Sequence, residues 1–344
     1  MAGLKLVVVY TETMMIKHTI DASGLDVLHV TQYDDKTTTT FPDGRTTTLW
    51  NNTGMISAKI IKDSINHAQN RITTFELEYP RFIHAELMTH RQFSRNAASS
   101  RAIPVANMIK QVELNPAVPV HWGQNQAGMQ AAVEVDLPQQ ALSQHAWRSA
   151  CASACEWARL LANQGLHKQI VNRVTEPFQI MKTIVTATEY KNWFWLRCHA
   201  DAQPEIKQLA DLMRLQQLQS DPQLLDVGDW HLPYVYSEFA FEQVFYDAAG
   251  TTLSLADAIK VSASCCAQVS YRRQDDSLEK AYAIYDRLIV SEPAHASPVE
   301  HQATPMPEVA DQQWPTGVTH QDAGGDYWSA NYCGWIQNRK LLGL

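Results

Sequence analysis

The stretch LMTHRQFSRNAASSRAIP, residues 87 to 104, constrains this chain more than any other feature. Within twelve residues it gathers His90, Arg91, Ser94, Arg95, Asn96, Ser99, Ser100 and Arg101. It holds no carboxylate, and small alanines separate its polar residues. Small residues let a ligand approach the backbone, and guanidinium and hydroxyl donors match phosphate oxygens. We therefore expect the chain to fold around an anion-binding segment here, although a solvated surface helix has the same composition.

Length and charge narrow the class of protein. The 344 residues, 45% of them hydrophobic, suffice for about two domains or one large one. With 36 acidic and 28 basic residues the net charge is −8, which disfavours a protein that coats nucleic acid. No apolar run reaches the roughly 18 residues of a membrane span, and the opening LKLVVVY is too short for a signal peptide. We expect a cytoplasmic protein that binds neither a membrane nor a nucleic-acid polymer.

The cysteines and histidines do not indicate a metal centre. Six cysteines form no C-x-x-C pair, so we expect reduced core residues without disulfides. Thirteen histidines include no H-E-x-x-H motif and no cluster at ligand spacing. No metal site is therefore expected.

Residue patterns along the chain predict its elements. Residues 1 to 55 are β-rich, with a Pro-Asp-Gly turn at 42 to 44 between two threonine-rich strands. Ile56, Ile60, Ile61 and Ile65 recur at helical spacing and predict a helix, whereas residues 72 to 79 alternate as a half-buried strand. Three further helices are expected from the apolar stripe between 142 and 161, from Pro204 onward, and over 277 to 290.

The spacing of the polar stretch resembles the signature of the flavin-dependent thymidylate synthases, R-H-R-x-x-S-x-N-x-x-S-x-R. The preceding TTFELEYPRFIHAE and the later VNRVTEP and NWFWLRCHADAQPEI resemble family segments as well. Two more pieces, CCAQVSYRR and HASPVEHQATP, normally precede the signature and here follow it. The resemblance thus implies a circularly permuted order, in which the segment ending at His301 lies near the strand that begins around Thr73.

The resemblance implies an α/β (α+β) fold with a mixed sheet and long helices, and a homotetramer whose active sites are shared between subunits. It also implies that the protein methylates C5 of dUMP to give dTMP, with FAD as cofactor and with methylenetetrahydrofolate and NADPH as co-substrates. The catalytic domain would span residues 56 to 305, after a β-rich N-terminal extension over 1 to 55 and before a C-terminal loop and aromatic tail over 306 to 344.

Site residues carry over from the family by position. Arg197 and Ser99 are the catalytic candidates, Arg197 by biasing the pyrimidine ring toward its anion. The substrate-binding candidates are Glu86, Ser99, Ser100, Arg101, Arg173 and Arg197, with Arg173 reaching a nucleotide on a neighbouring subunit. The flavin-binding candidates are His90, Arg91, Asn96, Asn192, Ser270 and His295.

Two residues, Ser99 and Cys198, could each be interpreted as a nucleophile or in another role. Ser99 is the candidate for a nucleophile, but no base stands at a fixed spacing from it, which favours phosphate binding. Cys198 follows Arg197, yet adjacent residues on a helix point in different directions, which favours a buried structural thiol.

The sequence also departs from the family pattern. Thr89 replaces the leading arginine of the signature, Ala97 and Ala102 replace two further residues, and Glu86 replaces a glutamine. A carboxylate accepts from an exocyclic amine, which cytosine has and uracil lacks. Modification of dCMP, or hydroxymethylation in place of methylation, is therefore an alternative. A flavin- and nucleotide-binding protein without catalysis is another.

Overall fold

The computed structural model describes residues 55–239, 241–270, 275–309 and 313–344, together with the backbone of five strands between Lys5 and Trp50. Those five strands form an antiparallel sheet in chain order. Their bounds are β1 Lys5–Thr11, β2 Met14–Ile20, β3 Asp26–Gln32, β4 Lys36–Thr40 and β5 Thr46–Trp50. The threonine-rich strands β4 and β5 pair antiparallel as predicted, and the turn expected between them lies outside the described residues.

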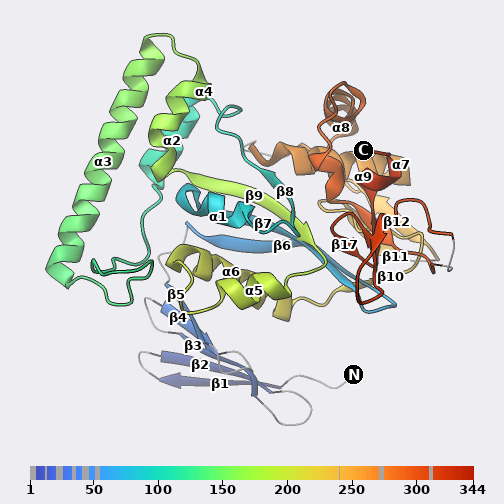
Figure 1. Cartoon of the computed structure of the whole chain (residues 1–344), viewed down its shortest axis with the longest axis horizontal. Helices are drawn as coiled ribbons and strands as arrows, with labels where there is room; N and C mark the ends of the chain where they lie inside the picture. The colour runs from blue at the N-terminus through green and yellow to red at the C-terminus, as the bar shows by residue number, and fades with distance from the viewer. Residues whose placement is uncertain are drawn as a thin grey trace.

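A second five-stranded sheet lies at the centre of the molecule (Figure 1), in the order β10-β6-β7-β9-β8. Its strands are β6 Ser57–Asn66, β7 Arg71–Pro80, β8 Ser94–Ala97, β9 Ile180–Ala187 and β10 Gln223–Leu225. The pairing of β10 with β6 is parallel and the other three pairings are antiparallel, which makes the sheet mixed as predicted. The edge strand β8 comes from the polar signature itself.

The predicted helix at the four isoleucines is wrong, because these residues lie on or next to β6. A bulge at Ile61 shifts the register between Ile60 and Lys62, so Ile60 and Ile65 return to one face despite their odd spacing. β-Branched side chains favour strands. The strand predicted over 72 to 79 is confirmed as β7.

Helices cover the central sheet and extend from it. The helices between β7 and β10 are α1 His84–Met88, α2 Val105–Leu114, α3 Leu137–Asn163, α4 Lys168–Val171, α5 Lys191–Arg197 and α6 Pro204–Gln219, with 3-10 helices η1 at Arg81–Ile83 and η2 at Asn172–Phe178. Helices α5 and α6 pack on one face, where Trp193 and Leu209 join the core against Phe75. The long α3 starts at its N-cap Asp136, packs on α2 and lies beside the sheet, at the left of Figure 1. The predicted helices around 142–161 and from Pro204 are confirmed.

The C-terminal third packs on the other face of the sheet. Its helices are α7 Leu255–Ala267, η3 Gln268–Ser270, α8 Leu278–Tyr285, η5 Ser297–Glu300 and α9 Asn338–Leu341, and a π-helical turn at Asp286–Val290 continues α8 as expected. Its strands are β11 Tyr236–Phe239, β12 Gln243–Tyr246, β13 Thr252–Leu253, β14 Ala303–Pro305, β15 His320–Gln321, β16 Tyr327–Ser329, β17 Tyr332–Cys333 and β18 Trp335–Gln337. In the tail, Tyr332 and Trp335 are buried core residues.

A buried chain of hydrogen bonds joins this third to the sheet. Ser64 Oγ lies 2.9 Å from His231 Nδ1, and His231 Nε2 lies 2.9 Å from Thr74 Oγ1. Thr74 contacts Thr186 Oγ1 at 2.7 Å, which lies 2.8 Å from His301 Nδ1. The segment ending at His301 therefore lies against β7 and β9, as the permuted order predicts.

These buried histidines predict a loss of stability in acid. Burial lowers the pKa of His301 from 6.5 to about 3, so folded His301 stays neutral while the unfolded chain takes up its proton. The unfolded state then binds more protons, and stability falls as the pH drops from about 6.5 toward about 3. We expect His301→Gln to make this pH profile shallower by up to about 1.4 kcal/mol per pH unit. Urea denaturation across this range measures it, and His145→Gln on exposed α3 is the matched control; equal profiles for both variants would contradict the prediction.

Candidate functional site

A hollow of about 230 Å³ opens beside the signature, where β8 ends. It is lined by Arg81, His84, Ala97, Ala98, Ser99, Ser100, Arg101, Arg173 and Met181. Glu176 pairs with Arg81 at 2.9 Å and more loosely with Arg173 at 3.7 Å. Three arginines thus line the hollow, and Glu176 pairs with only two of them, so the hollow is a positively charged site for an anion.

Asn172 brings the two sides of the hollow together. It is buried at the start of η2, and its Nδ2 donates to the carbonyls of Ser100 at 2.7 Å and Ile103 at 2.9 Å. Gln179 in turn donates to the Asn172 carbonyl at 2.7 Å. Arg173 therefore lies beside Ser99 and Arg101 of its own chain because its neighbour anchors the loop after the signature.

Arg81 and His84 line this hollow as well, although neither was predicted as a site residue from the sequence. Both follow β7, in a segment noted only as leading into the signature. Burial, then Arg81 and Arg95, lower the pKa of His84 to about 4, so its ring is neutral near neutral pH. The hydroxyl of Tyr79 lies 2.8 Å from His84 Nδ1 and orients the ring. An arginine directly after the proline that ends a strand was the available signal for this part of the site.

Arg197 is held at the end of α5 between two residues of the predicted site. Its Nη1 forms an ion pair with Glu86 Oε2 at 3.0 Å, and its Nε donates to His90 Nε2 at 2.9 Å. Because an arginine N–H is always a donor, His90 Nε2 accepts and the ring proton lies on Nδ1. Burial, followed by Arg197 and Arg95, lowers the pKa of His90 to about 4. Arg197 is thus the charged member of this contact.

Arg197 and Glu86 line a second and larger cavity of about 1160 Å³. Apolar walls from Phe82, Val120 and Trp147 face polar groups of α6 across it. Four carboxylates, those of Glu86, Asp201, Glu205 and Asp211, line it together with Arg197 and Lys207. Its aromatic walls and its hydrogen-bonding side chains suit a planar heterocycle with polar edges.

The predicted substrate residues therefore fall into two groups. Ser99, Ser100, Arg101 and Arg173 share the small hollow, whereas Glu86 and Arg197 share the large cavity. His84 and Glu86 are two residues apart on α1, so they point to different sides of that helix. One chain presents the two groups on different sides of α1.

The predicted flavin residues divide in another way. Arg91, Asn192 and His295 are exposed and free to meet a ligand. Ser270 Oγ accepts the backbone N–H of Ser99 at 2.8 Å, which ties η3 to the signature. Asn96 is buried and donates to the Cys266 carbonyl at 3.0 Å, so its amide already serves the packing of α7 on β8.

The described residues show neither a reactive thiol nor a metal site. All six cysteines are free and buried, as expected. Cys198 is buried in the core around Trp193 and Leu209, as predicted for a structural thiol, and burial and the nearby Asp211 raise its pKa to about 12. Within the described ranges no group of three His, Cys, Asp or Glu side chains is placed to hold a metal ion. In the same ranges every helix is too short or too polar to cross a membrane.

Comparison with known proteins shows which solved structures the chain is similar to. Two solved structures of the UMP/dUMP methylase PolB from Streptomyces cacaoi are similar to it, each with a TM-score of 0.40 and 48% of this chain covered. The structure with 5-Br UMP is 16% identical over 89% of its chain, and the one with 5-Br dUMP is 17% identical over 90%. No curated protein matches the sequence.

The family model of the thymidylate synthase complementing proteins matches residues 52–223. This range is half of the 344 residues and contains the signature, Arg173 and Arg197. The chain therefore belongs to this family, that of the flavin-dependent thymidylate synthases, as its signature predicts.

Proposed function

We propose that this protein is an enzyme that methylates C5 of dUMP to give dTMP, with FAD as cofactor and with methylenetetrahydrofolate and NADPH as co-substrates. The observation that carries the proposal is the hollow of three arginines built around the signature's own Ser99, Ser100 and Arg101. Its charge and its size of about 230 Å³ suit a phosphate group.

In this proposal the hollow holds the nucleotide phosphate. Arg81, Arg101 and Arg173 supply guanidinium donors, and the two serines supply hydroxyls. The Ser99 hydroxyl has no hydrogen bond to a histidine or carboxylate of the described chain, which supports phosphate binding rather than nucleophilic attack. The nucleotide is thereby oriented for reaction at its base.

Arg197 would meet the pyrimidine ring. Glu86 and His90 fix its guanidinium, so it is already oriented when negative charge develops on the ring. Because the pKa of His90 is lowered, its ring is neutral and adds no second positive charge beside the Arg197 guanidinium. Because the hollow and Arg197 lie on different sides of α1, we propose that each active site of a homotetramer combines the hollow of one subunit with Arg197 of another.

The flavin would lie along Arg91, Asn192, Ser270 and His295. Exposed guanidinium, amide and imidazole groups are suitable partners for a pyrophosphate and a ring edge, so the residues present fit FAD. His90 and Asn96 would act by positioning Arg197 and β8. When bound, the flavin supplies the hydride, and the protein contributes binding and orientation. Residues 56–305 would form this catalytic unit in circularly permuted order.

A second candidate activity is C5 modification of dCMP, by methylation or hydroxymethylation. Glu86 favours it, since this carboxylate faces the large cavity and one of its oxygens is not used by Arg197. A carboxylate accepts a hydrogen bond from the exocyclic amine of cytosine.

The flavin itself gives the first test. We expect the purified protein to be yellow and to release FAD on denaturation, and dUMP to accelerate reduction of that flavin by NADPH. A bound flavin that NADPH does not reduce, with or without nucleotide, would favour a binding protein without catalysis. A colourless protein that takes up no added FAD would contradict the proposal.

A further inference from the structure

The C-terminal tail contacts the signature through Asn331. Its Nδ2 donates to the backbone carbonyl of Gln92 at 2.8 Å and lies 3.2 Å from Ser94 Oγ. Asn331 sits in the turn between β16 and β17, more than two hundred residues away along the chain. The family model ends at residue 223, so this contact comes from a segment outside the matched range.

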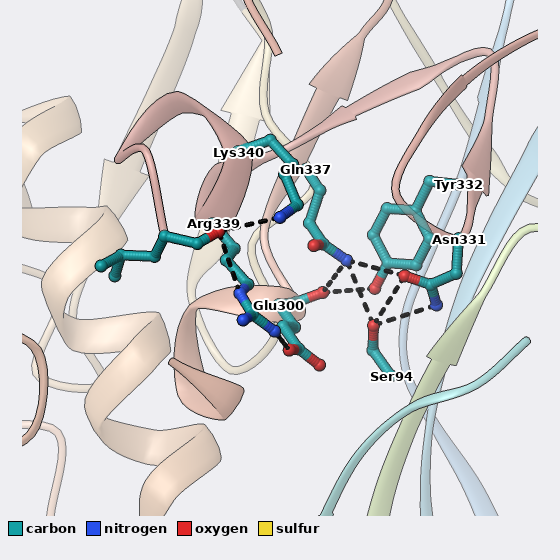
Figure 2. A network of polar contacts seen from close by, with 8 residues as sticks. Ser94, Glu300, Asn331, Tyr332, Gln337, Arg339 and Lys340 are labelled. Atoms are coloured by element: carbon teal, nitrogen blue, oxygen red, sulfur yellow. Dashed lines mark hydrogen bonds and ion pairs between the residues drawn. The ribbon is translucent and has the colours of Figure 1, made fainter. Parts of the chain in front are cut away.

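Gln337 extends the contact to a third segment. Its Nε2 lies 3.2 Å from Ser94 Oγ, 3.0 Å from Asn331 Oδ1 and 3.3 Å from the Glu300 carbonyl. Tyr332 also donates to that carbonyl, and Figure 2 shows Asn331, Tyr332 and Gln337 converging on Ser94 and Glu300. Gln337 is buried, so these bonds are sheltered from water.

The contacted turn needs such support. Arg91 and Gln92 are exposed and precede β8, the edge strand of the sheet, so ladder hydrogen bonds begin only at Ser94. A hydrogen bond from the Phe93 amide to the His90 carbonyl at 3.3 Å closes the turn from within. On the side of the turn that faces the tail, the Asn331 side chain donates a hydrogen bond to the Gln92 carbonyl.

We propose that the tail is a positioning element for the site, in which Asn331 and Gln337 set the turn that carries Arg91 against the segment 295–300. These two amides connect the turn after Arg91 to Glu300, the last residue of the segment that begins at the predicted flavin residue His295. The functional part of this inference rests on the proposed function. Asn331 and Gln337 are positioning residues and touch no substrate.

The test compares full-length variants by two measurements. Asn331→Ala removes the bond to Gln92, and because its side chain is partly exposed the chain is expected to fold. We expect amide hydrogen exchange over residues 91–93 to rise about tenfold, as for the loss of one hydrogen bond of about 1.4 kcal/mol. The Kd for FAD, measured by quenching of flavin fluorescence, is expected to rise by a similar factor. Gln337→Leu is expected to give the same pattern.

The control is Asp322→Ala, which perturbs the tail without touching the signature. Asp322 accepts from Gly324, Asp326 and Trp328, all within the tail hairpin. We expect it to leave both the exchange over 91–93 and the FAD Kd unchanged. If Asp322→Ala and Asn331→Ala behave alike, or if Asn331→Ala leaves the exchange unchanged, the positioning role is wrong.

Hydrogen exchange also separates this inference from the proposed function. It reports on the turn without any ligand, so a wild-type chain that binds no FAD would contradict the function while the exchange still decides the positioning. Faster exchange with an unchanged FAD Kd in a flavin-binding wild type would overturn the link to the flavin.

Discussion

Arg197→Ala is expected to lower kcat for C5 modification of dUMP by about 10² to 10³, or about 3 to 4 kcal/mol. The reason is that Arg197 is fixed in advance by Glu86 at 3.0 Å and by His90 at 2.9 Å, and so aims a permanent charge at the ring. Steady-state tritium release from C5-labelled dUMP at saturating nucleotide measures this loss.

Arg197→Lys separates charge from orientation. Lysine keeps the charge but has no Nε–H to give His90 and no second guanidinium nitrogen for a ring edge. We expect it to recover less than a tenth of the lost activity. Full activity in Arg197→Ala would show that the reaction does not use this residue.

Arg101→Ala is expected to raise the Kd for dUMP about 10- to 100-fold, in keeping with 1.5 to 3 kcal/mol for a charge-assisted hydrogen bond. Arg101 lines the anion hollow, is exposed there and has no ion pair within the described chain. Deoxyuridine, which lacks the phosphate, is expected to bind both proteins equally. Isothermal calorimetry measures all of these affinities.

The matched control for Arg101 is Arg148→Ala, an exposed arginine on α3 that lines neither cavity. It is expected to bind dUMP as the wild type does. If Arg101→Ala weakens deoxyuridine as much as dUMP, Arg101 does not act on the phosphate.

Mixed oligomers test whether the two halves of the site come from different subunits. Mixing Arg101→Ala with Arg197→Ala is expected to restore some activity, because a hybrid pairs an intact hollow with an intact Arg197. Mixing Arg101→Ala with Arg173→Ala is expected to restore none, since both residues line the hollow of one chain. Light scattering provides the control, and a monomer would end the shared-site proposal.

The signature could be found from the sequence because its chemistry is local. Ser99, Ser100 and Arg101 lie within three residues, and the structure puts all of them at one hollow. Helices with strong start signals, such as α6 after Pro204, were equally predictable. The strand at the isoleucines of β6 could not be predicted in this way, because a bulge changes the period of the strand and the spacing of the residues does not reveal a bulge.

Other parts of the site depend on long-range packing. Asn96 donates a hydrogen bond to α7, and His90 accepts one from Arg197. In both pairs the two residues are more than a hundred positions apart in the sequence. The role of Asn172 was equally hidden, since a buried asparagine next to Arg173 looks like any polar residue in a sequence. The tail matched no family segment, so its contact with Ser94 needed coordinates.

The decisive experiment on the proposed C5 methylation is tritium release from C5-labelled dUMP and dCMP, assayed side by side with FAD, methylenetetrahydrofolate and NADPH. We expect tritium release from dUMP that requires all three additions and is lost in Arg197→Ala. Release from dCMP alone would favour the second candidate activity. If a folded, flavin-loaded protein released no tritium from either nucleotide, the proposed enzymatic function would be wrong.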